Sequence, residues 1–351
     1  MTNASLIKNR ISWIDLAKFF GIFAIVIGHT IQGGWLKHYV YSFHVPLFFF
    51  VMGVTSALTN IDSKPFHKYI KKQSYSLLLP YYTFAIISTV VIFVASRFIQ
   101  FKEVVIFNEP LKLIAKVIIG YCDANKPLWF LPCAFVMCII AYFIIKYTNK
   151  IKSHKARLIV YFSISTILCV LMHINVNHLE INNIIFKTDS AIELLPFFLM
   201  GYCFLNYGIS EKIKKLNIFV RIIIGIVLIS TGAVSGLFNP EAGYLGNYYG
   251  NIAIFYLSAF STILGIIMLC TVVPPIKILT WCGARTLTIL LLHKFPILAF
   301  QKVIPFTKSY LAEFSIPVGI AVTLITIALC CIADIVITKL VPFLIGKSRS
   351  K

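Results

Sequence analysis

Long apolar runs recur along the whole sequence, and they limit the possible folds more than any other feature. Apolar residues make up 59% of the chain and charged residues only 13%, whereas a soluble domain carries about 25% charged residues. A helix needs about 20 predominantly apolar residues to cross a hydrocarbon core of about 30 Å. The sequence therefore predicts an all-α bundle of membrane-spanning helices. It excludes a soluble globule and a disordered chain, and because the runs do not alternate it also excludes a membrane β-barrel.

Positive charge follows these runs in a regular way. The net charge of +20 is spread over short clusters between the apolar segments, which indicates topology and contact with anionic lipid rather than nucleic-acid binding. With the N-terminus in the cytoplasm, the inner segments carry roughly twice as many Lys and Arg residues as the outer ones. We therefore expect an even number of spans and two cytoplasmic termini. The ten predicted spans are 12–31, 41–59, 75–97, 127–147, 157–175, 190–208, 217–237, 248–273, 286–301 and 315–340.

We expect residues 1–351 to form one transmembrane domain without an attached soluble domain. The first apolar run is interpreted as a retained span, because no small-residue cleavage site follows it. One outer segment is long, and its stretch Pro110–Tyr121 has an apolar helical face. Two interpretations stay open for that stretch: a helix lying in the outer membrane interface, or an ordinary loop helix.

The first span carries an unusual set of ionisable residues. At about 100° per residue, Lys18 and His29 lie within about 20° of each other, and Asp15 lies about 40° from His29. The three therefore form one polar stripe, with Lys18 about 16 Å from His29 along the axis. A charge in hydrocarbon is costly, so such residues are candidates for function. Each alone also has a structural explanation: an acid in the first helical turn, a lysine reaching the interface, and a helix-end histidine.

Two further histidines interrupt apolar runs. His44 opens the second span, and the hairpin formed with the first span places it near His29 at the outer end. Two histidines at one depth can serve as base and orienter, although His44 could also simply cap its helix. His293 interrupts the short ninth span and is expected to face the bundle, whereas the neighbouring Lys294 is expected to reach outward.

Other polar and aromatic candidates lie at the ends of spans. Trp129 begins the fourth span on the outer side, where it is either part of an aromatic belt or a platform for a sugar ring. For Glu193 in the sixth span and Asp334 in the last span, we favour a role in packing or in helix capping. Lys68, Lys71 and Lys72 precede the third span. They provide either plain positive-inside charge or a cytoplasmic patch for a phosphorylated ligand such as coenzyme A.

Several common motifs are absent from the sequence. It has no Walker loop, no G-x-G-x-x-G after a strand and no G-x-S-x-G elbow, so ATP-driven pumping, dinucleotide chemistry and a hydrolase elbow lack support. The nine cysteines include no C-x-x-C pair, so we expect neither a metal nor a redox site. There is also no convincing internal repeat of the kind found in many transporters.

Six short motifs together resemble those of the acyltransferase family 3 membrane proteins, and most nearly the fucose 4-O-acetylase-like group. The resemblance extends over about residues 10–300. In the usual family motif an arginine precedes the histidine with ten residues between them, and here that position is Lys18. The motifs are Arg10-x4-Asp15-x2-Lys18-x10-His29, Phe43-His44-x-Pro46, Leu79-Pro80-Tyr81, Leu128-Trp129-Phe130-Leu131, Pro196-Phe-Phe-Leu-x-Gly201 and Leu292-His293-x2-Pro296.

The resemblance implies a ten-span membrane enzyme that takes an acyl group, usually acetyl, from cytoplasmic acyl-coenzyme A. The acceptor it implies is a hydroxyl of a cell-surface or envelope glycan or of its lipid-linked precursor, and it makes His29 the catalytic histidine. Acetyl-coenzyme A is then a co-substrate, and no bound cofactor or metal is expected. The expected partners are acyl-coenzyme A, a glycan or glycolipid and membrane lipid, with no nucleic acid.

We therefore predict an O-acetyltransferase of the bacterial inner membrane. His29 takes the hydroxyl proton, or forms an acyl-histidine instead. The catalytic candidates are His29, Asp15 and His44; the donor-binding candidates are Lys18, Arg10, Lys71 and Lys72; the acceptor-binding candidates are Trp129, His293 and Glu193. One alternative is a glycolipid or polysaccharide transporter or flippase that uses the buried charges as a proton relay. Another is an acyltransferase of a different membrane family with a buried histidine.

Overall fold

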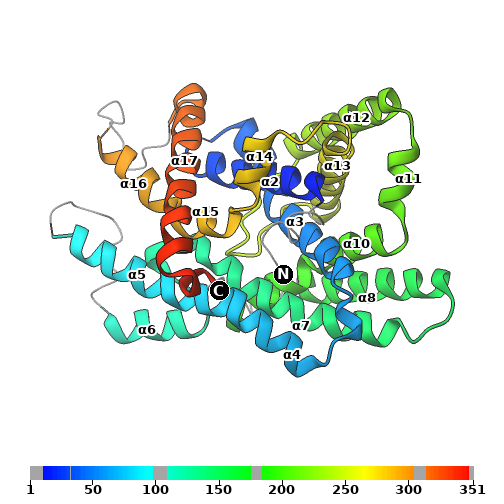
Figure 1. Cartoon of the computed structure of the whole chain (residues 1–351), viewed down its shortest axis with the longest axis horizontal. Helices are drawn as coiled ribbons and strands as arrows, with labels where there is room; N and C mark the ends of the chain where they lie inside the picture. Colours follow the sequence, from blue (N-terminus) through cyan, green and yellow to red (C-terminus); the bar gives the residue numbers. More distant parts are fainter. Residues whose placement is uncertain (1–10, 32, 98–108, 175–183, 304–313, 348–351) are drawn as a thin grey trace.

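The computed structural model describes residues 11–31, 33–97, 109–174, 184–303 and 314–347, and this part of the chain is built from helices (Figure 1). Its β contacts are two isolated bridges. The prediction of an all-α fold is therefore confirmed. The α-helices are α2 Ser12–Gly28, α3 Trp35–Leu58, α4 Phe66–Gln73, α5 Leu79–Ala95, α6 Pro110–Ile118, α7 Phe130–Thr148, α8 His154–Ile174, α9 Thr188–Glu193, α10 Leu195–Asn206, α11 Ile209–Lys215, α12 Ile218–Leu237, α13 Ile252–Cys270, α14 Lys277–Gly283, α15 Thr286–Leu292, α16 Lys294–Val303 and α17 Ile316–Leu340.

Short helical segments of other kinds join several of these helices. A π-helical segment continues α4 into α5, and a 3-10 segment leads into α7. Another 3-10 segment follows α17. The 3-10 segments are η1 Ile61–Ser63, η4 Asp123–Trp129, η6 Ile185–Lys187 and η7 Pro342–Ile345, and the π segment is η2 Ser74–Leu78.

The described helices are those of a multi-pass membrane protein. Seven are long and apolar enough to cross a membrane, or eight if the bent pair Ile185–Glu193 and Leu195–Asn206 forms one span. The predicted count of ten is not confirmed. The first expected span, α2, has 17 residues, and the ninth is divided at His293 between α15 and α16. The seven are Trp35–Leu58, Phe66–Ala95, Pro110–Thr148, His154–Ile174, Ile218–Leu237, Ile252–Cys270 and Ile316–Leu340.

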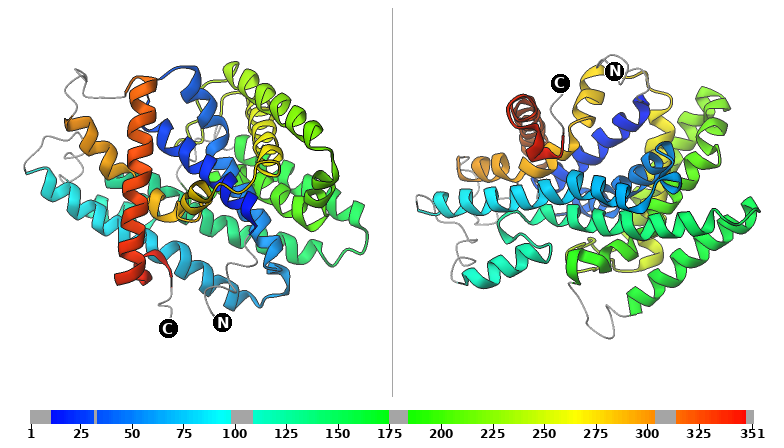
Figure 2. Two further views of the ribbon diagram at one scale, coloured as in Figure 1. Left: turned by 45° about the horizontal axis from the view of Figure 1, so that its top comes forward. Right: turned by 60° about the horizontal axis from the view of Figure 1, so that its bottom comes forward.

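Helix α2 runs through the middle of the bundle, with α17 on one side and α12 and α13 on the other (Figures 1 and 2). Most of its side chains are buried. Its N-terminal half packs closely on α14, because a Cβ added to Gly283 would lie 1.8 Å from the carbonyl oxygen of Asp15. Only a glycine allows this approach, and small residues at helix contacts are typical of membrane bundles.

The surface is apolar where the long helices face outward. Phe162, Phe219 and Ile86 are well exposed, and they lie on helices long enough to cross a membrane. Exposed apolar side chains on such helices are what a lipid environment requires.

Helix α6 confirms that the outer segment contains a helix with an exposed apolar face. Leu111 is 83% exposed, and Ile114 and Ile118 are also exposed, while Leu113 packs inward. An exposed apolar face suits a helix at a membrane surface. Its position in the outer interface stays a prediction.

Candidate active site

The bundle brings three histidines and several aromatic rings into one continuous chain of contacts, which we call the histidine chain: His293, His29, Tyr41, His44, Tyr244 and Trp129. The His29 and His293 rings stack with their centroids 5.4 Å apart. The Tyr41 ring lies 6.2 Å from His29 and 4.8 Å from His44. Tyr244 continues the chain, 5.5 Å from His44 and 6.1 Å from Trp129.

Local structure explains this convergence. His29 is the C-cap residue of α2, so its side chain stands at the helix end. Tyr41 and His44 lie three residues apart on α3, which places them on one helical face. His293 ends α15 directly before α16 begins. The break that divides the ninth predicted span is therefore the point at which its histidine meets His29.

The His29 ring is accessible and points into the bundle. Its side chain is exposed, yet the rings beside it come from α3 and from the α15–α16 junction. Its Nδ1 atom lies 3.5 Å from the Tyr41 hydroxyl. An imidazole in this position is accessible and lies beside the rings of two other elements of the bundle.

His44 and His293 are held in a defined orientation by the backbone. Nδ1 of His44 donates to the Val40 carbonyl at 2.6 Å, and Nδ1 of His293 donates to the Leu290 carbonyl at 2.9 Å. Because a carbonyl only accepts, Nδ1 carries the hydrogen, and in the neutral ring Nε2 carries the lone pair. Nε2 of His293 is buried and has no hydrogen-bond partner among the described residues. This nitrogen can therefore accept a hydrogen bond from a bound molecule.

The segment before α7 is hydrogen-bonded to residues next to His293 in the sequence. Asn125 is buried and donates from Nδ2 to the Leu291 carbonyl at 3.0 Å and to Ser88 Oγ at 3.1 Å. Lys294 donates from Nζ to the Ala124 carbonyl at 3.1 Å. We expected Lys294 to reach outward, whereas its ammonium group bonds to a backbone carbonyl of this segment. Asn125 was not predicted as a site residue, because nothing near it in the sequence links it to α15.

Trp129 lines a cavity of about 300 Å³ at the far end of the histidine chain. The ring is only 7% exposed, and its other face stacks on Tyr244. Within the cavity wall, Lys116 and Asp123 form an ion pair at 2.6 Å. The lining is thus aromatic with a few charged groups, as is usual in small-molecule sites. It consists of Lys116, Ile119, Tyr121, Cys122, Asp123, Lys126, Trp129 and Leu245.

A buried ion pair positions the loop that carries Tyr244. Lys187 and Asp189 are both 0% exposed, with Nζ and Oδ2 3.0 Å apart. Lys187 also donates to the Leu245 carbonyl at 3.1 Å, and Asn247 donates to Asp189 at 2.6 Å. The pair therefore fixes the loop beside Trp129. The sequence prediction counted Lys187 only as an outer-side charge, because its burial depends on contacts far away in the sequence.

Glu193 belongs neither to the histidine chain nor to the lining of the Trp129 cavity. It is buried at the end of α9, and both carboxylate oxygens have no hydrogen-bond partner among the described residues. Its backbone carbonyl accepts a hydrogen bond from Tyr256 at 2.5 Å. The structure therefore brings Trp129 and His293 into the histidine chain, but not Glu193.

Asp15 and Lys18 lie at the opposite end of α2 from His29. Asp15 is buried and pairs with Lys18 at 3.6 Å, and about 16 Å of helix separates Lys18 from His29. The polar stripe expected from the sequence is therefore divided into an ion pair, Asp15 and Lys18, near one end of α2 and the His29 imidazole at the other. Arg10, another predicted donor-binding residue, lies outside the described residues.

A charge cluster that sequence reasoning missed accompanies this end. Asp334 of α17 pairs with Arg285 at 3.1 Å and with Lys347 at 3.2 Å, and it accepts a hydrogen bond from Thr288 at 2.5 Å. The Arg285 guanidinium lies 3.8 Å from the centroid of the Trp281 ring. Asp334 is therefore an ion-pair centre, beyond the packing or capping role that the sequence favoured. Helix α15 links this cluster to His293 over about 12 Å.

The predicted lysine patch lies on a cavity of about 670 Å³ at the junction of α4 and η2. Burial, followed by the charge of Lys72, lowers the pKa of the neighbouring Lys64, as expected for a surface of positive potential. The Tyr75 hydroxyl donates to the Lys347 carbonyl at 3.4 Å, so the C-terminal segment connects this cavity to Asp334. The lining residues are Lys68, Lys71, Lys72, Ser74, Tyr75 and Leu79.

The chain was compared with models of protein families, with curated proteins and with solved structures. A family model described as an acyltransferase domain matches residues 11–335. That range contains the whole histidine chain as well as Asp15, Lys18, Arg285 and Asp334. No curated protein and no solved structure matches the chain.

Proposed function

We propose, from the premise that the chain belongs to the acyltransferase-domain family, that this membrane acyltransferase is an O-acetyltransferase of the cell membrane. It moves an acetyl group from cytoplasmic acetyl-coenzyme A to a hydroxyl of a cell-surface or envelope glycan, or of its lipid-linked precursor. One observation carries the proposal: an accessible imidazole, His29, stacks on His293 at one end of α2, while cations gather at the other end.

The reaction proposed at His29 is a general-base acyl transfer. The imidazole takes the proton of the acceptor hydroxyl as its oxygen attacks the thioester carbonyl. A C–O bond forms, the C–S bond breaks, and the imidazolium returns its proton to the departing thiolate. The route through an acyl-histidine stays open, since an accessible imidazole could equally attack the thioester itself.

The neighbouring groups have the properties that this reaction needs. Among the described residues, Nε2 of His293 is a buried acceptor without a hydrogen-bond partner, so it can receive a hydrogen bond from a second hydroxyl of the acceptor sugar and orient the sugar. The Tyr41 hydroxyl lies beside His29 and can donate to the oxyanion that develops on the carbonyl oxygen. His44 holds Tyr41 and Tyr244 in place through ring contacts.

The cytoplasmic end is proposed to bind the donor. Coenzyme A carries phosphates, and Lys71 and Lys72 line a cavity connected through Lys347 and Asp334 to Arg285. Lys and Arg bind phosphate through charge-assisted hydrogen bonds. Lys18 lies at the same end of α2, on the way to His29. We assign Asp15 a positioning role, because it is buried and paired with Lys18.

The Trp129 cavity is proposed to bind the acceptor sugar. Trp129 and Tyr121 provide aromatic surface, and Lys126, Lys116 and Asp123 provide polar groups. Such a mixture suits a ring that is apolar on its faces and hydroxylated on its edges. Through Tyr244 the cavity adjoins His44 and hence the reaction centre.

The proposal is tested by mass spectrometry of surface glycans from cells that express the wild-type protein, His29→Ala or no protein. We expect the acetyl increment with the wild type only. His38→Ala is the matched control, since His38 lies on α3 outside the histidine chain, and it should restore acetylation. Membrane levels of each variant are compared in parallel. Wild-type acetylation in cells with His29→Ala would contradict the assignment, and unchanged glycans in cells without the protein would contradict the function.

A further inference from the structure

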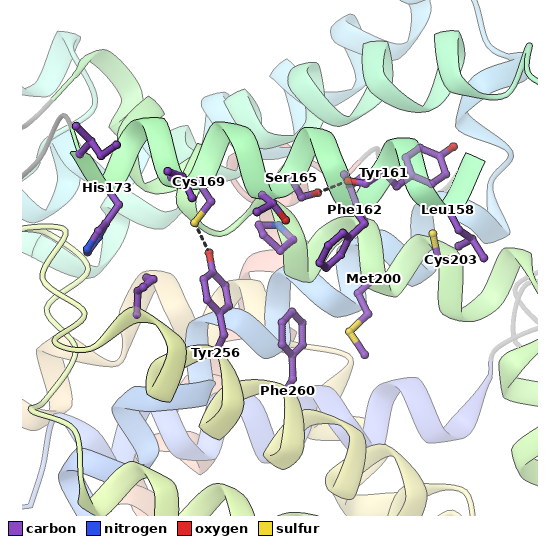
Figure 3. A pocket seen from close by; sticks show the side chains of 16 residues that line it. Leu158, Tyr161, Phe162, Ser165, Cys169, His173, Met200, Cys203, Tyr256 and Phe260 are labelled. Carbon is purple, nitrogen blue, oxygen red and sulfur yellow. Dashed lines mark hydrogen bonds between the residues drawn. The ribbon is translucent and has the colours of Figure 1, made fainter. Parts of the chain in front are cut away.

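A third cavity, of about 610 Å³, lies between α8, α10 and α13, apart from the histidine chain (Figure 3). Phe162, Met200 and Phe260 form much of its surface, and Phe162 is 75% exposed at its mouth. We call this cavity the side groove. Along α8 it extends from Leu158 to Ile174, about 24 Å at the rise of an α-helix.

The side groove opens toward lipid. Two of its walls, α8 and α13, are long and apolar enough to cross a membrane, so the medium at its mouth is hydrocarbon. A length of about 24 Å covers most of a hydrocarbon core of about 30 Å. A hydrocarbon chain is thus the ligand that this geometry favours.

Three polar side chains in the middle of the groove wall, those of Ser165, Cys169 and Tyr256, have partners within the protein. Ser165 Oγ donates to the Tyr161 carbonyl at 2.7 Å, and Cys169 Sγ lies 2.8 Å from the Tyr256 hydroxyl, which donates to the carbonyl of Glu193 (Figure 3). An apolar chain lying over them therefore costs no hydrogen bond.

One end of the side groove carries Arg157, a cation that forms no ion pair with a carboxylate in the part of the chain that the structure describes. Arg157 directly precedes Leu158, and its guanidinium contacts His154 at 2.9 Å and the ring of Tyr207 at 5.9 Å. Among the described residues no carboxylate lies within ion-pair distance of Arg157, and its Nε is buried without a hydrogen-bond partner. Lys152 and Lys155 are exposed beside it. This end suits a phosphate, because Arg binds phosphate in a bidentate manner.

We propose that the side groove is a binding site for one anionic phospholipid of the inner leaflet. One acyl chain lies along α8 between α10 and α13, and the phosphate meets Arg157. The positive-inside distribution puts the segment before α8 on the cytoplasmic side, where anionic headgroups attract basic residues. Through Tyr256 and the Glu193 carbonyl, the lipid would brace the junction of α9 and α10, which is bent by 61°.

The test measures lipid retained by the purified full-length protein, using native mass spectrometry after incubation with phosphatidylglycerol or with phosphatidylcholine of the same chains. We expect one phosphatidylglycerol per protein and at least tenfold weaker retention of phosphatidylcholine. Arg157→Gln should remove this preference. Met200→Trp should fill the groove and abolish retention of both lipids, whereas Leu171→Trp, on an exposed part of α8 outside the groove, should leave retention unchanged.

Two results would overturn the proposal. Equal retention of the two lipids, unaffected by Arg157→Gln, would show that no phosphate site exists. Displacement of phosphatidylglycerol by a polyprenyl phosphate at equimolar concentration would assign the groove to a lipid-linked substrate instead. Thermal unfolding of each variant identifies misfolding, and because Arg157 is partly exposed, its variant keeps the test decisive if Met200→Trp does not fold.

Discussion

The two ends of α2 are built from different chemistry. At the His29 end, the histidines contact aromatic rings and backbone carbonyls, whereas at the Asp15 end the side chains form ion pairs. A general base must carry a free lone pair, and a site for phosphates must keep its positive charge. In the proposed mechanism each end therefore has one task, and helices α2 and α15 connect the two ends.

The largest effect should follow from removing the base. His29→Gln keeps a polar side chain but lacks an imidazole, and general-base catalysis contributes about 10²–10⁴-fold. We expect kcat to fall by about 10³-fold while donor affinity stays the same, because the phosphate-binding groups lie at the other end. Steady-state kinetics and acyl-coenzyme A binding, measured on the purified enzyme, test both halves. A large loss of donor affinity would contradict the division of tasks.

Replacing the second histidine should have a smaller effect at the same end. His293→Phe keeps a ring stacked on His29 but removes the buried Nε2 acceptor. We expect kcat to fall by about 10²-fold, the scale of one lost orienting hydrogen bond in an active site. His293→Asn, which restores an acceptor, should recover part of the rate. Nearly normal activity in His293→Phe, together with a large loss in His293→Asn, would show that the ring's packing, and not its acceptor, matters.

At the charged end the expected change is in binding. Arg285→Met leaves Asp334 paired with Lys347, so the fold should persist. Losing one phosphate contact of about 1.4 kcal/mol corresponds to a tenfold change, and we expect the donor KM to rise about tenfold with kcat nearly unchanged. Arg221→Met is the control, because Arg221 donates to the Thr271 carbonyl between α12 and α13. A fall in kcat without a change in KM would contradict a donor-binding role.

The smallest effect should appear at the acceptor cavity. Trp129→Leu removes aromatic surface from the cavity at a position that is already largely buried and stacked on Tyr244. We expect the acceptor KM to rise about fivefold, since an aromatic contact contributes about 1 kcal/mol, and the donor KM to stay constant. Varying each substrate separately distinguishes these outcomes, and a matching rise in donor KM would show a general disturbance of the bundle.

Part of this organisation could be predicted from the sequence. The all-α membrane bundle followed from the long apolar runs, and the resemblance to an acyltransferase family was confirmed. His29, His44 and His293 stood out because ionisable residues are rare in apolar helices. The structure brings these three together, but their catalytic roles stay predictions.

The remaining features depend on tertiary contacts. Tyr244 lies in a loop, and the buried pair Lys187–Asp189, together with the hydrogen bond from Ser190 Oγ to the Tyr244 carbonyl, places that loop beside Trp129. Arg285, directly before α15, pairs with Asp334 on α17, about fifty residues further along the chain. The count of ten spans is not confirmed, because apolar content alone does not show where a helix ends: α2 has 17 residues, and the ninth run is divided between α15 and α16.

The most direct test of the central claim is a sided assay in sealed vesicles with uniformly oriented protein. Acetyl-coenzyme A is supplied on the face that bears Lys71 and Lys72, and a glycan acceptor on the opposite face. We expect acetylated glycan only in this arrangement, and none when the two substrates are exchanged. Product that forms only when both substrates share one face would contradict transfer between the two ends of α2.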